Sequence, residues 1–122
     1  MKKIMIVDDQ PEVRELVEVT LLSESYEILQ TDTGGKAIEM AIREKPSIIL
    51  MDIMMPGEID GLEAARIIKS NSDTKDSYII MLTAKGQKID IEKCLQVGAD
   101  DYFIKPFSPL MLINKVEEVL KQ

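Results

Sequence analysis

Five polar residues stand directly after short apolar segments of the 122-residue chain: Asp8 and Asp9 after residues 4–7, Asp52 after residues 48–51, Thr83 after residues 79–82, and Lys105 after residues 102–104. If these segments are parallel strands of one open sheet, their carboxyl ends meet at one edge. Ligands of such sheets bind at that edge. The pattern therefore predicts a site with three carboxylates, one hydroxyl and one amine.

Three aspartates in one place carry a large negative charge. An aspartate has a reference pKa of about 3.9, so all three favour the ionised form at neutral pH. Two carboxylates ~4 Å apart repel each other by roughly 4 kcal/mol at an effective dielectric constant of about 20. A hard divalent cation with oxygen ligands relieves this repulsion. We therefore predict a Mg²⁺ site, with Mn²⁺ as an alternative ion and Lys105 as a second, fixed positive charge.

Each of the five residues also has a purely structural interpretation. Asp9 and Glu12 have the spacing of a capping box at the start of a helix. The other two aspartates would then be loop acids, with the threonine a turn hydroxyl and the lysine a surface amine. Because all five follow strand ends and none lies at the opposite edge, the joint pattern favours a functional site.

Apolar periodicity predicts the elements that position these residues. The continuous apolar segments 4–7, 48–51 and 79–82 are typical of strands buried on both faces, and 27–31 and 102–104 are weaker strands. Helical periodicity covers about residues 13–21, 37–41, 62–68, 87–97 and 112–120. This alternation predicts an α/β fold: one domain over residues 1–122, with a parallel sheet between two layers of helices.

Composition excludes several classes of function. The 22 acidic and 15 basic side chains give a net charge of -7, which argues against direct binding to nucleic acid. The absence of histidine excludes a Ser-His-Asp triad, an HExxH metal site and a phosphohistidine relay within the chain. The single cysteine, Cys94, excludes an internal disulfide. The apolar segment 4–7 is too short for a signal sequence or a membrane span, so we expect a cytoplasmic protein without membrane association.

Four motifs complete the pattern: Asp8-Asp9; residues 51–56 (Met-Asp-Ile-Met-Met-Pro) with Asp60-Gly61; Thr83-Ala84; and residues 98–107 (Gly-Ala-Asp-Asp-Tyr-Phe-Ile-Lys-Pro-Phe). With these motifs the chain resembles a response-regulator receiver domain over essentially its whole length. The resemblance implies a doubly wound, flavodoxin-like fold with five parallel strands in the order 2-1-3-4-5 and five helices. It also implies a signalling switch of a two-component system or phosphorelay, and not an enzyme with a diffusible substrate.

The resemblance assigns roles to the acidic residues. Asp52 matches the aspartate that accepts a phosphoryl group and becomes an acyl phosphate. Asp9, Asp52 and the backbone carbonyl of Met54 would bind Mg²⁺, and Asp8 would assist directly or through water.

The resemblance also assigns the switch and the partners. Lys105 and Thr83 would contact the phosphoryl group, and Tyr102 matches the aromatic side chain whose rotamer follows Thr83. Because the chain has no histidine, the phosphoryl donor is expected to be a histidine kinase, a histidine phosphotransfer protein or a small phosphodonor. Phosphorylation would change the surface of the fourth helix, fifth strand and fifth helix, which would bind a downstream protein. We expect a monomer or a phosphorylation-dependent dimer.

Three features depart from the common family pattern. The loop 55–61 has one residue more between its proline and its Asp-Gly pair than the commonest form. Met54 and Lys85 occupy variable positions that tune the phosphoryl lifetime in the family. The fourth helix is weakly patterned, which leaves its output surface poorly defined.

The family's turn after the fifth strand also predicts a cis peptide bond between Lys105 and Pro106.

Three other functions remain open on the residues alone. A docking module that works without phosphorylation needs no complete acidic set, whereas this chain has one. A metal-dependent phosphohydrolase with an aspartyl-phosphate intermediate usually has a second aspartate where this chain has Met54. A flavin-binding module needs a loop that attracts phosphate, whereas Asp8 and Asp9 repel anions in the absence of a metal.

Overall fold

The computed structural model describes residues 1–22, 25–84 and 88–121. In these ranges strands and helices alternate along the chain: β1 (Lys2–Val7), α1 (Pro11–Thr20), β2 (Tyr26–Thr31), α2 (Gly34–Glu44), β3 (Ile48–Asp52), α3 (Gly61–Ser70), β4 (Tyr78–Ala84), α4 (Lys88–Gln96), β5 (Asp101–Lys105) and α5 (Pro109–Leu120). None of the described helices is long and apolar enough to cross a membrane.

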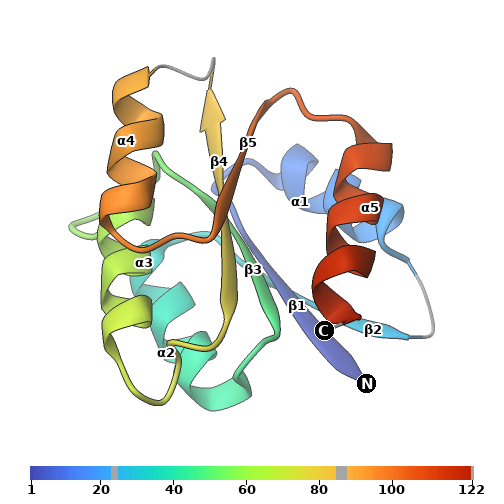
Figure 1. Cartoon of the computed structure of the whole chain (residues 1–122), viewed down its shortest axis with the longest axis horizontal. Coiled ribbons are helices and arrows are strands. Elements are labelled where there is room, and N and C mark those ends of the chain that lie inside the picture. The colour runs from blue at the N-terminus through green and yellow to red at the C-terminus, as the bar shows by residue number, and fades with distance from the viewer. Residues whose placement is uncertain (23–24, 85–87, 122) are drawn as a thin grey trace.

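The strands form one parallel sheet in the order β2-β1-β3-β4-β5 (Figure 1). This arrangement confirms the predicted doubly wound topology. Because β1 and β3 are neighbours, the residues that follow them come together at one edge. In the register between these strands, Val7 is the partner of Met51, so Asp8, the residue after β1, lies beside Asp52, the last residue of β3.

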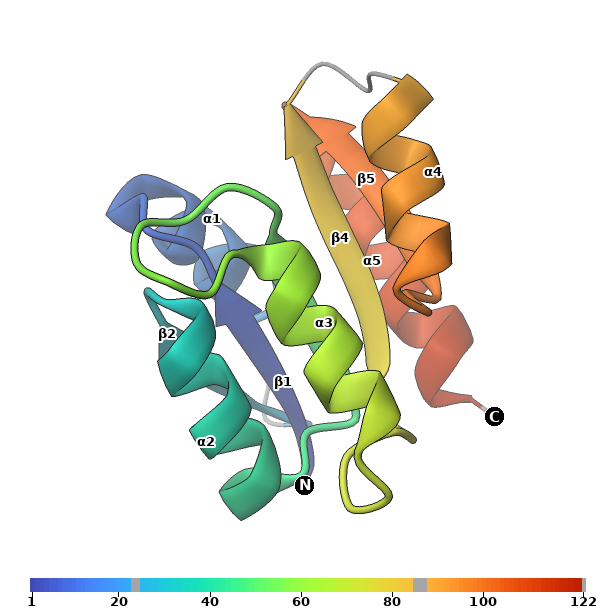
Figure 2. The same cartoon turned by 90° about the vertical axis from the view of Figure 1, so that its left-hand side faces the viewer.

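Two hydrophobic cores cover the two faces of the sheet. Helices α1 and α5 lie on one face and α2, α3 and α4 on the other (Figures 1 and 2). Alternate strand residues divide between the cores: Ile4, Ile6, Ile48 and Leu50 face α1 and α5, whereas Met5, Val7, Ile49 and Met51 face the other layer. Burial on both faces explains why these strands are apolar at every position.

Helix starts follow local capping chemistry. The Asp60 carboxylate accepts a hydrogen bond from the Glu63 N–H at 2.9 Å, and the Ser108 hydroxyl accepts one from the Met111 N–H at 3.4 Å. Helix α1 differs, because its N-cap is Gln10 and no side chain caps it. The capping-box interpretation of Asp9 is therefore wrong.

Helix α4 is the element that the sequence predicted least well. It covers Lys88–Gln96 in place of the predicted 87–97, and residue 87 lies outside the described residues. Cys94 faces the core and is 1% exposed, as expected of a small buried residue. The peptide bond between Lys105 and Pro106 is cis, which confirms the expectation from the family.

Candidate functional site

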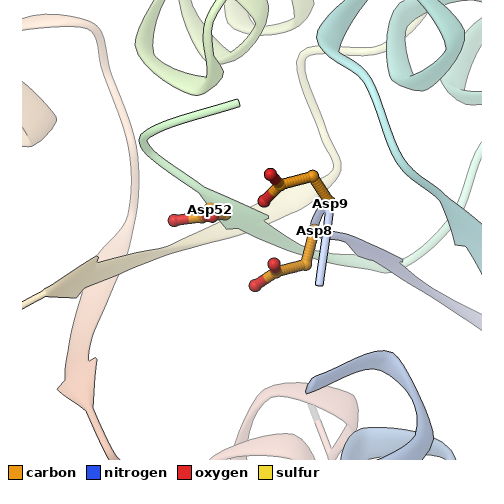
Figure 3. Close-up of side chains that lie close together, drawn as sticks. All are labelled: Asp8, Asp9 and Asp52. Carbon is orange, nitrogen blue, oxygen red and sulfur yellow. The ribbon is translucent and has the colours of Figure 1, made fainter. Parts of the chain in front are cut away.

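Three carboxylates gather at the carboxyl ends of β1 and β3. One oxygen atom from each of Asp8, Asp9 and Asp52 lies within 4.8 Å of the others. Figure 3 shows Asp8 and Asp9 just after β1 and Asp52 at the end of β3, with the carboxylates extending in the same direction. Asp8 and Asp52 are buried, whereas Asp9 is exposed. The sequence predicted this grouping correctly.

Asp8 is held by four neighbours. Its backbone N–H donates to the carbonyl oxygen of Thr31 at 3.2 Å, and its own carbonyl oxygen accepts from the Arg14 guanidinium at 2.6 Å. Its carboxylate accepts from the Gln10 N–H at 2.9 Å and from Lys105 Nζ at 2.7 Å. Sequence reasoning missed Arg14 and Gln10, because neither follows a strand directly. These contacts fix the loop that presents the acidic pair.

Asp52 ionises in an unfavourable environment. Its side chain accepts a hydrogen bond from the Met54 N–H at 3.4 Å, and its second oxygen lies 3.5 Å from Lys105 Nζ. Burial first, and then the nearby Asp8 carboxylate, raise the pKa of Asp52 to about 6, although Lys105 acts in the opposite direction. Ionisation of Asp52 is therefore less favourable in the folded protein than in the unfolded chain.

The donor set fits a hard divalent cation. When all three carboxylates are ionised, Lys105 compensates one of their charges and leaves two uncompensated. Oxygen atoms from two carboxylates or more, placed beside water-accessible space, are the ligands that Mg²⁺ binds in proteins. The cluster therefore has both the charge and the donor chemistry for one such ion.

Thr83 lies near the end of β4, and its hydroxyl is buried without a hydrogen-bond partner among the described residues. The residue as a whole is 1% exposed. Buried hydroxyls without partners are rare in folded proteins. Tyr102 is on β5 opposite Met81, so it lies on the same face of the sheet as Thr83. Its ring packs partly against the core and also lines a separate cavity of about 630 Å³ beside α5.

The long loop after β3 uses glycine at two positions for two different reasons. Gly57 adopts a φ of 104°, a left-handed conformation that favours glycine. Gly61 begins α3, and a Cβ atom there would lie 1.8 Å from the carbonyl oxygen of Asp52. Its N–H donates to the carbonyl oxygen of Ile53 at 2.9 Å. The glycine thus lets α3 begin directly against the end of β3, close to the acidic cluster.

A cleft of about 570 Å³ opens beside the cluster. Its lining combines loop, strand and helix residues: Asp9, Gln10, Asp52, Ile53, Met54, Ala84, Asp90 and Lys105. The Met54 side chain is 78% exposed at this cleft. Asp90 comes from α4 and was not a predicted site residue, because it does not follow a strand. Lys85, the other predicted tuning position, lies outside the described residues.

Comparison with known proteins gives the family. The family model described as "Response regulator receiver domain" matches residues 4–117. The chain belongs to the response-regulator receiver family. Receiver domains are phosphorylation-dependent switches of two-component signalling and not enzymes in the usual sense, and this chain is such a receiver domain.

Individual relatives agree with this assignment. The chain is 43% identical over 121 residues to the phosphate regulon transcriptional regulatory protein PhoB of Pseudomonas aeruginosa. The aligned region covers 99% of this chain and 52% of that protein. The chain therefore spans about half the length of this curated relative. Among solved structures, the receiver domain of sensor histidine kinase PA1611 from Pseudomonas aeruginosa has a TM-score of 0.89 and 32% identity, covering 99% of this chain and 98% of that one. That structure has a magnesium ion coordinated in its active site cleft. Vibrio cholerae chemotaxis protein CheY4 has a TM-score of 0.88 and 29% identity, with 98% of each chain covered.

Proposed function

We propose that residues 1–122 form one receiver domain in which Asp52 accepts a phosphoryl group from a histidine kinase or a histidine phosphotransfer protein. The observation that carries the proposal is the group of three carboxylates within 4.8 Å of one another, with Lys105 beside them. In this group Asp52 is central, because it contacts Lys105 and also lines the open cleft.

Asp8, Asp9, Asp52 and the backbone carbonyl of Met54 would hold one Mg²⁺ ion, with Mn²⁺ as a substitute. When bound, the ion would neutralise the carboxylates and the oxygens of an incoming phosphoryl group. The uncompensated negative charge of the acidic cluster supports this assignment. The PA1611 receiver, which has magnesium coordinated in its active site cleft, also supports it.

Transfer itself requires little of the protein beyond positioning and charge. A carboxylate oxygen of Asp52 attacks phosphorus and forms a P–O bond, while the P–N bond of the donor phosphohistidine breaks. The electron pair of that bond stays on the donor nitrogen, and a donor imidazole protonated at its other nitrogen leaves as neutral imidazole. Lys105, 3.5 Å from Asp52, would pair with the phosphoryl oxygens as negative charge accumulates on them.

Thr83 and Tyr102 would report the phosphorylated state. The Thr83 hydroxyl lacks a partner among the described residues, and a phosphoryl oxygen would supply an acceptor. Movement of Thr83 would release space on the face it shares with Tyr102. The surface of α4, β5 and α5 would then change and bind a downstream protein or a second copy of the chain.

The test is intact mass after incubation with acetyl phosphate, with and without Mg²⁺. We expect the wild type to gain one phosphoryl group only with Mg²⁺, and Asp52→Asn to gain none. Asp76→Asn is the matched control, because Asp76 is exposed and precedes β4 at the opposite edge of the sheet. Phosphorylation of the Asp52→Asn variant, or no adduct on the wild type under any of these conditions, would refute the proposal.

A further inference from the structure

Asp90 places a fourth carboxylate at the phosphorylation cleft. It lies in the first turn of α4 and lines the cleft together with residues from the ends of β1 and β3. The cleft wall thus contains Asp9, Asp52 and Asp90 but, among the described residues, a single cation, Lys105.

No described side chain pairs with Asp90. Among the side chains of residues 1–22, 25–84 and 90–121, none forms a hydrogen bond or an ion pair with Asp90. Lys105 Nζ lies 2.7 Å from Asp8 and 3.5 Å from Asp52, so its charge is already shared by two other carboxylates. The charge of Asp90 also acts on the buried Cys94 thiol: burial is the largest cause of the raised pKa of Cys94, and the charge of Asp90 is the second. An anion entering the cleft therefore approaches the negative charge of Asp90.

We propose that Asp90 is a specificity-determining residue that disfavours phosphodonors carrying two negative charges, such as acetyl phosphate, relative to donors carrying one. This inference rests on the proposed function of Asp52. Repulsion by Asp90 acts on every anionic donor and grows with the charge of that donor. A phosphohistidine protonated at its other ring nitrogen carries one net negative charge, whereas acetyl phosphate carries two. Asp90 would therefore favour phosphohistidine over acetyl phosphate as the donor.

The size of the effect follows from the charge of the donor. A unit charge about 10 Å away in a water-like dielectric changes the local concentration of a monoanion about 2-fold and that of a dianion about 4-fold. Acetyl phosphate is a dianion at neutral pH, and phosphoramidate is a monoanion. The reaction is otherwise the same, because Asp52 forms the new P–O bond while acetate or ammonia leaves with the electron pair; the nitrogen of phosphoramidate is already protonated.

The experiment compares Asp90→Asn with Glu92→Gln. Glu92 is exposed on the same helix and is not part of the cleft lining, so its variant makes the same change in net charge at another place. Initial phosphorylation rates are measured with both small donors at saturating Mg²⁺, at low and at high ionic strength. The affinity for beryllofluoride, an anion that mimics the phosphoryl group, gives a second readout without covalent chemistry.

At low ionic strength we expect Asp90→Asn to react about 4-fold faster with acetyl phosphate and about 2-fold faster with phosphoramidate, and to bind beryllofluoride about 2-fold more tightly. These differences should shrink at high ionic strength because salt screens the charge. Glu92→Gln should behave as the wild type. Equal effects of the two variants, or no effect of Asp90→Asn, would overturn this inference while leaving Asp52 as the acceptor. A wild type that reacts with neither donor would instead contradict the proposed function.

Discussion

Replacing Asp52 with asparagine is expected to stabilise the metal-free protein at neutral pH. The folded protein raises the pKa of Asp52 from 3.8 to about 6, mainly through burial. The folded state therefore binds this proton more tightly than the unfolded chain does. Ionisation of Asp52 consequently favours unfolding, and its contribution to stability is lost as the pH rises from 3.8 to about 6.

The magnitude follows from that shift. Each pKa unit corresponds to about 1.4 kcal/mol, so a shift of about two units corresponds to at most about 3 kcal/mol at neutral pH. This shift already includes the opposing attraction of Lys105, which lies 3.5 Å from the Asp52 carboxylate. We therefore expect Asp52→Asn to raise the free energy of unfolding by about 1–3 kcal/mol.

The assay is urea unfolding in the presence of a chelator, at about pH 7.5 and again at about pH 4. The gain in Asp52→Asn should be present at the higher pH and should largely disappear at the lower one, where the wild-type carboxyl is mostly protonated. Glu92→Gln, which removes an exposed acid from α4, should change stability by less than about 0.5 kcal/mol. Added Mg²⁺ should stabilise the wild type more than the variant. An Asp52→Asn variant no more stable than the wild type at neutral pH would refute the account of Asp52 as a buried, destabilising charge.

Three further outcomes are expected. Gly61→Ala should destabilise the protein by about 1–3 kcal/mol in urea unfolding, because the added Cβ would meet the Asp52 carbonyl oxygen. Gly35→Ala is the control: a Cβ atom there would have no neighbouring atom within 4 Å, so this variant should be neutral or stabilising. Thr83→Val should raise the stability of the unphosphorylated protein by about 1 kcal/mol, because it removes a buried hydroxyl without a partner among the described residues; a loss of stability would indicate a hydrogen bond instead. The Cys94 thiol should react slowly with Ellman's reagent at about pH 8 until urea unfolds the protein. The reason is that the residue is 1% exposed and the pKa of its thiol is raised to about 11. Rapid reaction of the native protein would contradict its burial.

Most of the fold could be predicted from the sequence because the strands are buried on both faces. Residues 48–51 are apolar at every position, and both cores use them alternately. Helix α4 was harder to predict because it has a weak apolar pattern, with Cys94 among its core contacts. Its position is fixed by packing against the sheet, which a local pattern does not encode.

The acidic site was predictable because parallel strands carry their carboxyl ends to one edge. Asp8 and Asp9 follow β1 and Asp52 ends β3, so their meeting required only the topology. Arg14 and Asp90 reach the same region from helices. Their contribution depends on helix rotation and side-chain direction, and each occurs in the sequence as one charged residue among many.

Identification of the phosphorylated residue in the wild-type protein tests the central claim most directly. The protein would be phosphorylated with acetyl phosphate and Mg²⁺, reduced with borohydride and mapped by peptide mass spectrometry. Borohydride converts an aspartyl phosphate into homoserine and leaves unmodified aspartates unchanged. The account predicts homoserine at position 52 alone, and only when Mg²⁺ was present. Homoserine at position 8 or 9, or none at position 52 in a protein shown to carry a phosphoryl group, would contradict it.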